Sequence, residues 1–152
     1  MKEFRSLFLT GIPVLLVLSA LCGGVQAWIS EVDLRAILMS SPVEEAAKSS
    51  GIPMVDTRQM KEITAQGSHL ILDARTLAEY DQGHLPGAMS LPYSDFEDSF
   101  IALAPLLSPT DPLVVYCSSR TCDDALLLAQ RLQEVGFENL SLYVDGWEGW
   151  GQ

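Results

Sequence analysis

Blocks of apolar residues alternate with amphipathic segments along residues 52–152, and this pattern predicts strands and helices in turn. Short, continuous apolar runs are typical of strands that are buried on both faces of a sheet. Strands are predicted in this way at residues 52–56, 70–73, 88–91, 113–116 and 140–144. Helical spacing of apolar residues predicts helices at residues 57–65, 96–107, 125–135 and 147–150. Because strands alternate with helices, the predicted fold is α/β, with a mainly parallel central sheet and helices on both faces.

The first 27 residues have a different pattern, which predicts a hydrophobic helix in front of the α/β fold. A short, slightly basic head precedes apolar residues 7–21, and small residues precede a cleavage site after Ala27. This arrangement is typical of a secretory signal peptide. Residues 7–25 would equally span a bilayer as an uncleaved anchor, at about 28 Å for 1.5 Å per residue. Both interpretations stay open, and both predict an exported, periplasmic or extracytoplasmic domain, either soluble after cleavage or membrane-associated.

Residues 28–51 are interpreted as a connector between this leader and the domain. They show some helical spacing that Ser41-Pro42 interrupts, and no candidate for chemistry falls among them. With 152 residues in all, the chain has room for one domain, which we assign to residues 52–152.

The charge of the chain excludes several classes of function. Lys and Arg total 9 against 20 Asp and Glu, so the net charge is −11. Residues 28–152 hold 7 basic and 19 acidic residues, a net charge of −12. A nucleic-acid partner is therefore not expected, because binding phosphates requires a basic face. The three cysteines fit neither a disulfide-dense miniprotein nor a zinc cluster, so no metal is expected either.

Candidate chemistry lies in the loop that follows the predicted strand 113–116. The strand leads into Cys117, and a polar stretch then leads to Cys122 and the predicted helix 125–135; the polar residues are Ser118, Ser119, Arg120 and Thr121. Backbone N–H groups of such a loop, together with the N-terminus of the helix, stabilise a thiolate, a persulfide or an anion. Cys117 is therefore a candidate nucleophile. The alternative, an inert buried cysteine at a strand end, stays open at this point.

Other motifs accompany the loop in a specific order. They are Leu72-Asp73-Ala74-Arg75, Glu79-Tyr80, Gly83-His84-Leu85-Pro86-Gly87-Ala88, Val114-Val115-Tyr116-Cys117, Gly136-Phe137, Asp145-Gly146-Trp147 and Trp150. From about residue 55 to residue 150, the chain thus resembles the rhodanese-like sulfurtransferases. The resemblance implies that Cys117 carries sulfane sulfur as a persulfide, taken from a small donor such as thiosulfate or polysulfide and passed to a thiol acceptor. It implies no metal or organic cofactor, and it implies that Asp73 and Arg75 brace the site by hydrogen bonds.

Two loop positions depart from the family pattern. Arg120 stands where the family commonly has glycine, and it either offers its planar fork to an anionic donor or points to solvent. Cys122 stands where arginine, serine or threonine is common. It either resolves a persulfide or sulfenate on Cys117 by forming a disulfide, or is a small residue at a helix start. Whether the two cysteines face each other at bonding distance is left open by the sequence.

Helix starts and loop charge add further expectations. Thr57 is predicted to cap the helix at 57–65, and Thr121-x-x-Asp124 is predicted to form a capping box before the helix at 125–135.

Asp123 and Asp124 oppose the field of that helix, so we expect a less acidic Cys117 thiol and weak activity with thiosulfate. Asp123 also occupies the position where cysteine-dependent phosphatases need an arginine, which argues against a phosphatase.

These observations favour a sulfurtransferase that acts on a small sulfur donor and a thiol acceptor. Two alternatives remain. One is a thiol–disulfide redox protein or sensor that uses the Cys117–Cys122 pair without sulfur transfer. The other is a non-catalytic rhodanese-like module whose loop binds a partner or an anion.

Overall fold

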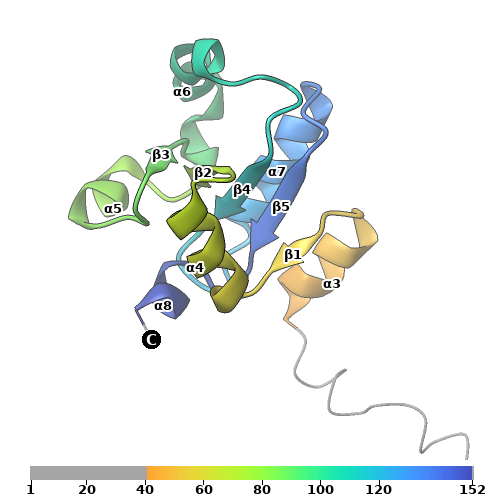
Figure 1. Ribbon diagram of the computed structural model, residues 1–152. Helices are drawn as coiled ribbons and strands as arrows, with labels where there is room; N and C mark the ends of the chain where they lie inside the picture. The colour runs from red at the N-terminus through yellow and green to blue at the C-terminus, as the bar shows by residue number, and fades with distance from the viewer. Residues whose placement is uncertain (1–40, 152) are drawn as a thin grey trace, which may run out of the picture. The chain divides into compact units, whose positions relative to one another are not determined.

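The computed structural model describes residues 41–151, which contain one sheet of five parallel strands (Figure 1). The strands are β1 (Met54–Val55), β2 (Leu70–Asp73), β3 (Ala88–Ser90), β4 (Leu113–Tyr116) and β5 (Leu140–Tyr143). Their order across the sheet is β1-β5-β4-β2-β3, so β4 occupies the centre. The predicted parallel sheet is thus confirmed, and the prediction for β4 matches residue for residue.

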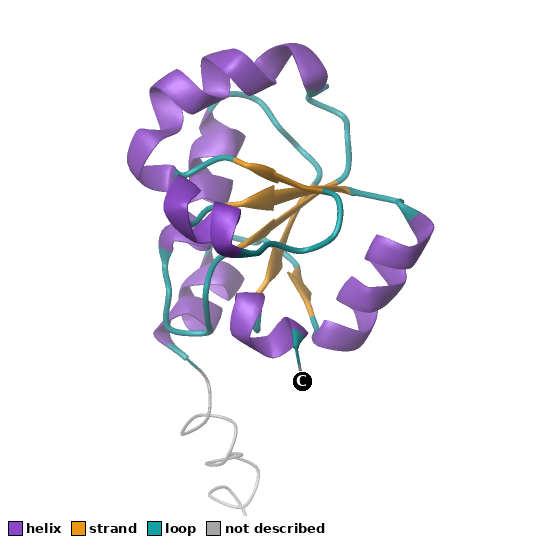
Figure 2. Ribbon diagram, turned by 90° about the vertical axis from the view of Figure 1, so that its left-hand side faces the viewer, coloured by secondary structure: helices purple, strands orange, loops and turns teal. Residues whose placement is uncertain are grey.

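Helices cover both faces of the sheet, as predicted, and Figure 2 shows them on either side of the strands. They are α3 (Pro42–Ser49), α4 (Thr57–Gln66), α5 (Leu77–Gln82), α6 (Phe96–Leu103), α7 (Asp124–Glu134) and α8 (Gly146–Trp150), with short 3-10 turns η1 (Tyr93–Asp95) and η2 (Ala104–Leu106). Side chains of β4 alternate between the two faces. Val115 packs in the cluster of α3, α6 and α7. Tyr116 packs in the other cluster, with Met60 of α4 and Trp147 of α8.

The leader and most of the predicted connector lie outside the described residues. The signal peptide or anchor expected at residues 1–27 therefore remains a prediction. Within residues 41–151, no helix combines the length and hydrophobicity that crossing a membrane requires.

The last part of the predicted connector is a helix that packs on the domain. The interruption expected at Ser41-Pro42 is the start of α3, where the Ser41 side chain accepts a hydrogen bond from Glu44 N–H and the Glu44 carboxylate accepts one from Ser41 N–H. Proline is well accommodated there because the first helical N–H has no partner within the helix. Ala47 is fully buried in the core cluster that includes α7. Helix α3, in a segment expected to hold no chemistry, thus places Glu44 close to the loop between Cys117 and Cys122.

Several predicted helix ends were wrong, each for a local reason. Asp56, rather than Thr57, caps α4 by accepting a hydrogen bond from Gln59 N–H at 2.7 Å. The capping box of Thr121 and Asp124 does not form, because the Thr121 hydroxyl bonds with that of Ser119 and α7 begins only at Asp124. The helix expected to reach residue 107 ends as an α-helix at Leu103 and continues as η2. Helix α5, with only six residues, was not predicted.

The register of the sheet decides which residues meet at its functional edge. Asp73, Tyr116 and Tyr143 end three neighbouring strands and are paired in register across β2, β4 and β5. Ligands of parallel sheets bind outside the carboxyl ends of the strands. The residues that follow these three positions, among them Cys117, are therefore gathered at one edge.

Candidate functional site

Cys117 is the first residue after β4, and the turn between β5 and α8 holds its backbone in place. Its carbonyl accepts a hydrogen bond from Trp147 N–H, and the next carbonyl, of Ser118, accepts one from Glu148 N–H, both at 2.9 Å. This close approach requires glycine at position 146, where φ is 62° and a Cβ atom would lie 2.6 Å from the Cys117 carbonyl oxygen. Cys117 itself is only 3% exposed. The base of the loop is thus fixed by backbone contacts.

The two cysteines of the loop are joined in a disulfide, with their Cα atoms 6.1 Å apart. A tight turn brings Cys122 back, since its N–H donates to the Ser119 carbonyl at 3.1 Å. The Ser119 and Thr121 hydroxyls bond to each other at 3.1 Å across the same turn. The pairing that the sequence left open is therefore within reach of this fold.

Among the described residues, Cys117, Cys122 and Asp124 form a group whose ligand atoms lie within 4.8 Å of one another. The two sulfur atoms are bonded together, and metals bind thiolates rather than disulfide sulfur. Burial raises the pKa of the Asp124 carboxyl, and the negative charges of Asp123 and Glu79 add to this effect. Negative charge therefore crowds the side of the loop that carries Cys122.

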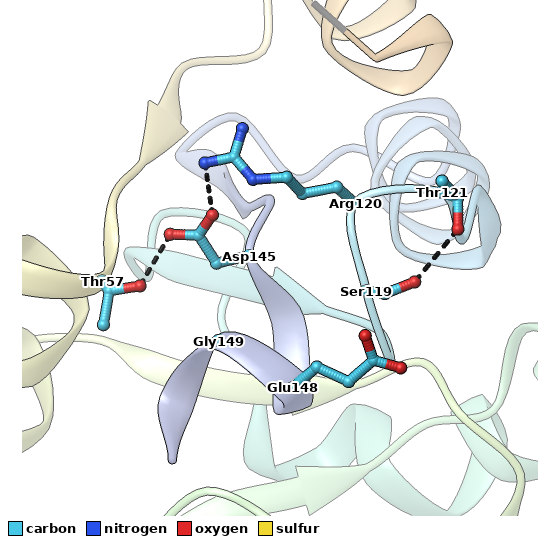
Figure 3. A pocket seen from close by; sticks show the side chains of 7 residues that line it. All are labelled: Thr57, Ser119, Arg120, Thr121, Asp145, Glu148 and Gly149. Carbon is cyan, nitrogen blue, oxygen red and sulfur yellow. Dashed lines mark hydrogen bonds and ion pairs between the residues drawn. The ribbon is translucent and has the colours of Figure 1, made fainter. Parts of the chain in front are cut away.

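The Arg120 side chain is about half-exposed, and its guanidinium forms ion pairs that the sequence did not predict. Its guanidinium pairs with Glu44 of α3 and with Asp145 of the β5–α8 turn, at 2.5 Å in each case. Asp145 also accepts a hydrogen bond from the Thr57 hydroxyl at 2.6 Å (Figure 3). The arginine fork is thus occupied by two carboxylates, and its positive charge is compensated within the protein.

A pocket of about 580 Å³ opens beside this ion-pair group. Figure 3 shows the residues that line it, which are Thr57, Ser119, Arg120, Thr121, Asp145, Glu148 and Gly149. Three of the predicted loop residues are among them. Because the charge of Arg120 is matched by its two partners and Glu148 adds another carboxylate, the pocket offers little attraction to a dianion.

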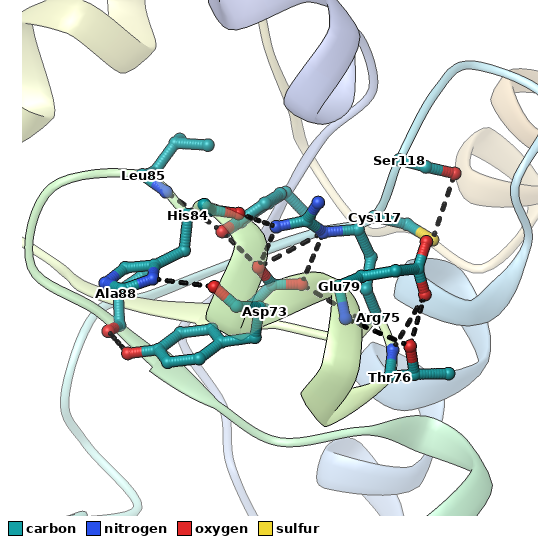
Figure 4. A network of polar contacts seen from close by, with 12 residues as sticks. Asp73, Arg75, Thr76, Glu79, His84, Leu85, Ala88, Cys117 and Ser118 are labelled. Atoms are coloured by element: carbon teal, nitrogen blue, oxygen red, sulfur yellow. Dashed lines mark hydrogen bonds and ion pairs between the residues drawn. The ribbon is translucent and has the colours of Figure 1, made fainter.

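A buried polar network lies directly under the loop (Figure 4). The Arg75 guanidinium donates to both carboxylate oxygens of Asp73, at 3.0 and 2.6 Å, and to the Gly83 carbonyl at 2.8 Å. The Tyr116 hydroxyl donates to Asp73 and accepts from Leu85 N–H. Asp73 is fully buried and Arg75 is 4% exposed. Since Tyr116 immediately precedes Cys117, this geometry suits the bracing role expected for Asp73 and Arg75.

The pKa values of Arg75 and Tyr116 are both raised in this network. Burial opposes the charge of Arg75, but the hydrogen bond and charge of Asp73 outweigh it, so the pKa of Arg75 lies above its usual value. Burial, together with the hydrogen bond to Asp73, raises the pKa of the Tyr116 hydroxyl. The strand end under Cys117 is therefore held by one ion pair and a neutral phenol.

Sequence reasoning missed the roles of Glu44, Tyr116 and Asp145. Tyr116 and Asp145 stand inside the quoted motifs, so their positions were flagged although their contacts were not. Glu44 had no such signal, because it lies 76 positions from Arg120 and within a segment interpreted as a connector. Only the packing of α3 against the domain brings the two side chains together.

Comparison with known proteins identifies the family. Residues 56–152 match the family model of the rhodanese-like domain. A tRNA sulfurtransferase of Desulfurococcus amylolyticus is 37% identical over 76 residues, which are 50% of this chain and 14% of that protein. YrkF of Bacillus subtilis (strain 168), which bears the name of a sulfur carrier protein, is 25% identical over 118 residues, 77% of this chain and 60% of that protein. This chain thus spans less than two thirds of either relative.

A solved structure supports the fold. The human single-domain sulfurtransferase TSTD1 superimposes with a TM-score of 0.57 and 23% identity, covering 64% of this chain and 94% of that one. At this level of identity the likeness concerns the fold alone. The fold described above is thus similar to that of a solved single-domain structure.

Proposed function

This chain belongs to the rhodanese-like domain family, and from that premise we propose that it is a sulfurtransferase that carries sulfane sulfur as a persulfide on Cys117. The observation that carries the proposal is the placement of Cys117. It follows the central strand directly, its carbonyl is fixed by Trp147 N–H, and α7 begins a few residues further on. The N-terminus of a helix favours negative charge such as that of a thiolate or a persulfide.

The proposed reaction starts from the reduced loop, in which Cys117 is a thiolate. The thiolate attacks the outer sulfur of a donor such as thiosulfate, the bond between the two donor sulfurs breaks, and sulfite leaves with that electron pair. Cys117 then holds one additional sulfur. An acceptor thiol attacks this outer sulfur, takes it as its own persulfide, and returns Cys117 as a thiolate. These proposed steps require no metal ion or organic cofactor.

The charges of the site bear on the choice of donor. Arg120 is compensated by Glu44 and Asp145, and Asp124 lies beside the disulfide. A donor with less negative charge than thiosulfate therefore meets less repulsion. We accordingly propose an uncharged organic polysulfide or another low-charge sulfane compound as the better donor, with thiosulfate as a weak one.

Intact-mass measurement tests the proposal. The full chain carrying Cys22→Ser, so that only the loop cysteines remain, is reduced, freed of reductant and treated with polysulfide or thiosulfate. Sulfur transfer predicts that Cys117 takes up sulfur, and that the Cys117→Ala variant takes up none. If neither donor ever adds sulfur to Cys117, directly or in the absence of Cys122, the proposed function is wrong.

A second candidate function is favoured by the disulfide itself. A thiol–disulfide redox protein would cycle between the reduced and the bonded Cys117–Cys122 pair without handling sulfane sulfur. In the same measurement, this candidate predicts the loss of two hydrogens with a disulfide oxidant and no uptake of sulfur by any variant.

We further propose that the domain is exported, on the basis of the leader pattern at residues 1–27. A loop disulfide is compatible with such a compartment, where disulfides persist. Cell fractionation, followed by N-terminal sequencing of the mature chain, tests this. A cytosolic protein that keeps its reduced cysteines and its first residues would contradict it.

A further inference from the structure

We propose that Cys122 is a resolving thiol that discharges the persulfide within the loop, so that the protein releases hydrogen sulfide and needs a dithiol reductant to complete its cycle. The proposal rests on the proposed function, because it starts from the Cys117 persulfide. It changes the reaction class, since the outer sulfur leaves as sulfide rather than passing to an external acceptor.

The chemical step is balanced within the protein and the donor. Cys122 attacks the inner sulfur of the persulfide, which is the Cys117 Sγ atom, and the bond from that atom to the outer sulfur breaks. The outer sulfur leaves with the electron pair and takes up the proton that Cys122 loses. Together with loading, thiosulfate and two loop thiols yield sulfite, hydrogen sulfide and the Cys117–Cys122 disulfide. An external dithiol then reduces the disulfide.

The fold places the two sulfur atoms within reach of this step. The loop accommodates the Cys117–Cys122 bond while the hydrogen bonds that anchor it remain made, namely those from Trp147 to Cys117 and from Cys122 to Ser119. The product of the proposed step is therefore compatible with the folded site. In this disulfide form, α8 keeps its backbone contacts with the loop.

Burial distinguishes the internal thiol from an external one. Cys117 is 3% exposed, and Gly146 and Trp147 pack against its backbone. An acceptor in solution approaches the outer sulfur of a persulfide more readily than the buried Sγ atom behind it. Cys122, which lies inside the same loop, has direct access to that buried atom. The geometry thus leaves the outer sulfur to an external thiol and makes the Cys117 Sγ atom the target of Cys122.

The negative charge around the loop also favours Cys122 over an external thiol as the attacking group. Glu148 and Asp145 line the pocket beside the loop, and Asp124 lies next to Cys122. An acceptor thiolate from solution must approach these carboxylates as an anion, whereas Cys122 is already in place. An intramolecular reaction also avoids the entropic cost of bringing two molecules together.

A single-turnover experiment without external thiol tests the proposal. The full chain carrying Cys22→Ser is reduced, desalted under anaerobic conditions and mixed with excess thiosulfate, and both the intact mass and the released sulfide are measured. We expect the loss of two hydrogens and the release of one sulfide per chain. A further Cys122→Ser substitution should hold one additional sulfur and release no sulfide until a thiol is added. A further Cys117→Ser substitution should show neither change.

The outcomes separate this inference from the proposed function. If the chain with both loop cysteines holds the additional sulfur stably and releases no sulfide, Cys122 is not a resolving thiol, while the proposed sulfurtransferase function stands. If the Cys122→Ser variant gains no sulfur from thiosulfate or from polysulfide, the proposed function itself fails. If Cys122 alone is loaded and Cys117 resolves it, the assigned roles are reversed and the inference is overturned.

Discussion

Replacing Gly146 by alanine tests how the β5–α8 turn holds the loop that carries Cys117 and Cys122. A Cβ atom at this position would lie 2.6 Å from the Cys117 carbonyl oxygen and 2.8 Å from both the carbon and the oxygen of the Ser118 carbonyl. These are backbone atoms, so no flexible side chain can move aside. The loop must shift away from α8, and the two hydrogen bonds from Trp147 and Glu148 lengthen or break.

The magnitude follows from two contributions. Gly146 has a φ of 62°, and a non-glycine residue in this left-handed region costs about 1–2 kcal/mol. Each lost backbone hydrogen bond removes about 0.5–1.5 kcal/mol of net stabilisation. We therefore expect Gly146→Ala to lower the free energy of unfolding by roughly 2–5 kcal/mol.

Gly67 provides a matched control. Its φ of 59° is nearly the same, but a Cβ atom there would meet nothing within 4 Å. Gly67→Ala should therefore show only the backbone contribution of about 1–2 kcal/mol. Urea unfolding of both variants in the disulfide form measures the two losses. In the reduced form, Gly146→Ala should also load sulfur onto Cys117 more slowly, while Gly67→Ala should not. Equal losses of stability and equal loading rates in the two variants would refute the reasoning.

Three other predictions concern the buried network and the charge of the loop. Asp73→Asn leaves the buried Arg75 guanidinium without its counter-charge. The substitution should lower the free energy of unfolding, measured in urea, by about 3–5 kcal/mol. A loss below about 1 kcal/mol would show that the Asp73–Arg75 pair does not stabilise the fold. Asp124→Asn should raise the rate of loading from thiosulfate by up to about fivefold at low salt, because a charge pair near the protein surface contributes up to about 1 kcal/mol. The gain should vanish at high salt. Asp98→Asn on α6, which changes the net charge equally, should have no such effect, and an equal gain there would contradict a local cause. Burial raises the pKa of the Tyr116 hydroxyl, so this tyrosine ionises at lower pH in the unfolded chain than in the folded protein. The free energy of unfolding should therefore fall as the pH rises above about 10. Tyr116→Phe should flatten this fall, and an unchanged pH dependence in the variant would contradict the role given to Tyr116.

The strands were predictable because their signal is local. Each buried strand of a parallel sheet needs a short apolar run, and β4 and β2 show one without interruption. Helix α5 escaped prediction because six residues are too few for a recognisable helical spacing. The failed capping box at Thr121 has a different cause. The turn that pairs the two cysteines holds Thr121 away from the helix start, and no pattern of residue types reveals this competition.

Some residues of the candidate site were also predictable from local features, whereas others depend on contacts between distant parts of the chain. Cys117 was identified from its place after an apolar strand and before a helix, which are both local features. The setting of Arg120 was not predictable, because its partners Glu44 and Asp145 come from distant parts of the chain. A guanidinium that is free in an isolated loop would attract an anionic donor. In the folded protein, its charge is instead compensated by two carboxylates.

The amino-acid sequence alone determined the α/β class, the predicted nucleophile and the acidic character of this protein, because apolar periodicity, strand-to-loop transitions and charge are properties of neighbouring residues or of the whole composition. Only the tertiary structure decided that Cys122 reaches Cys117, that Asp73 and Tyr116 meet under the loop, and that Arg120 pairs with two carboxylates. These contacts depend on the order and register of the strands and on the packing of α3, and the most distant of these partners, Glu44 and Arg120, lie 76 positions apart.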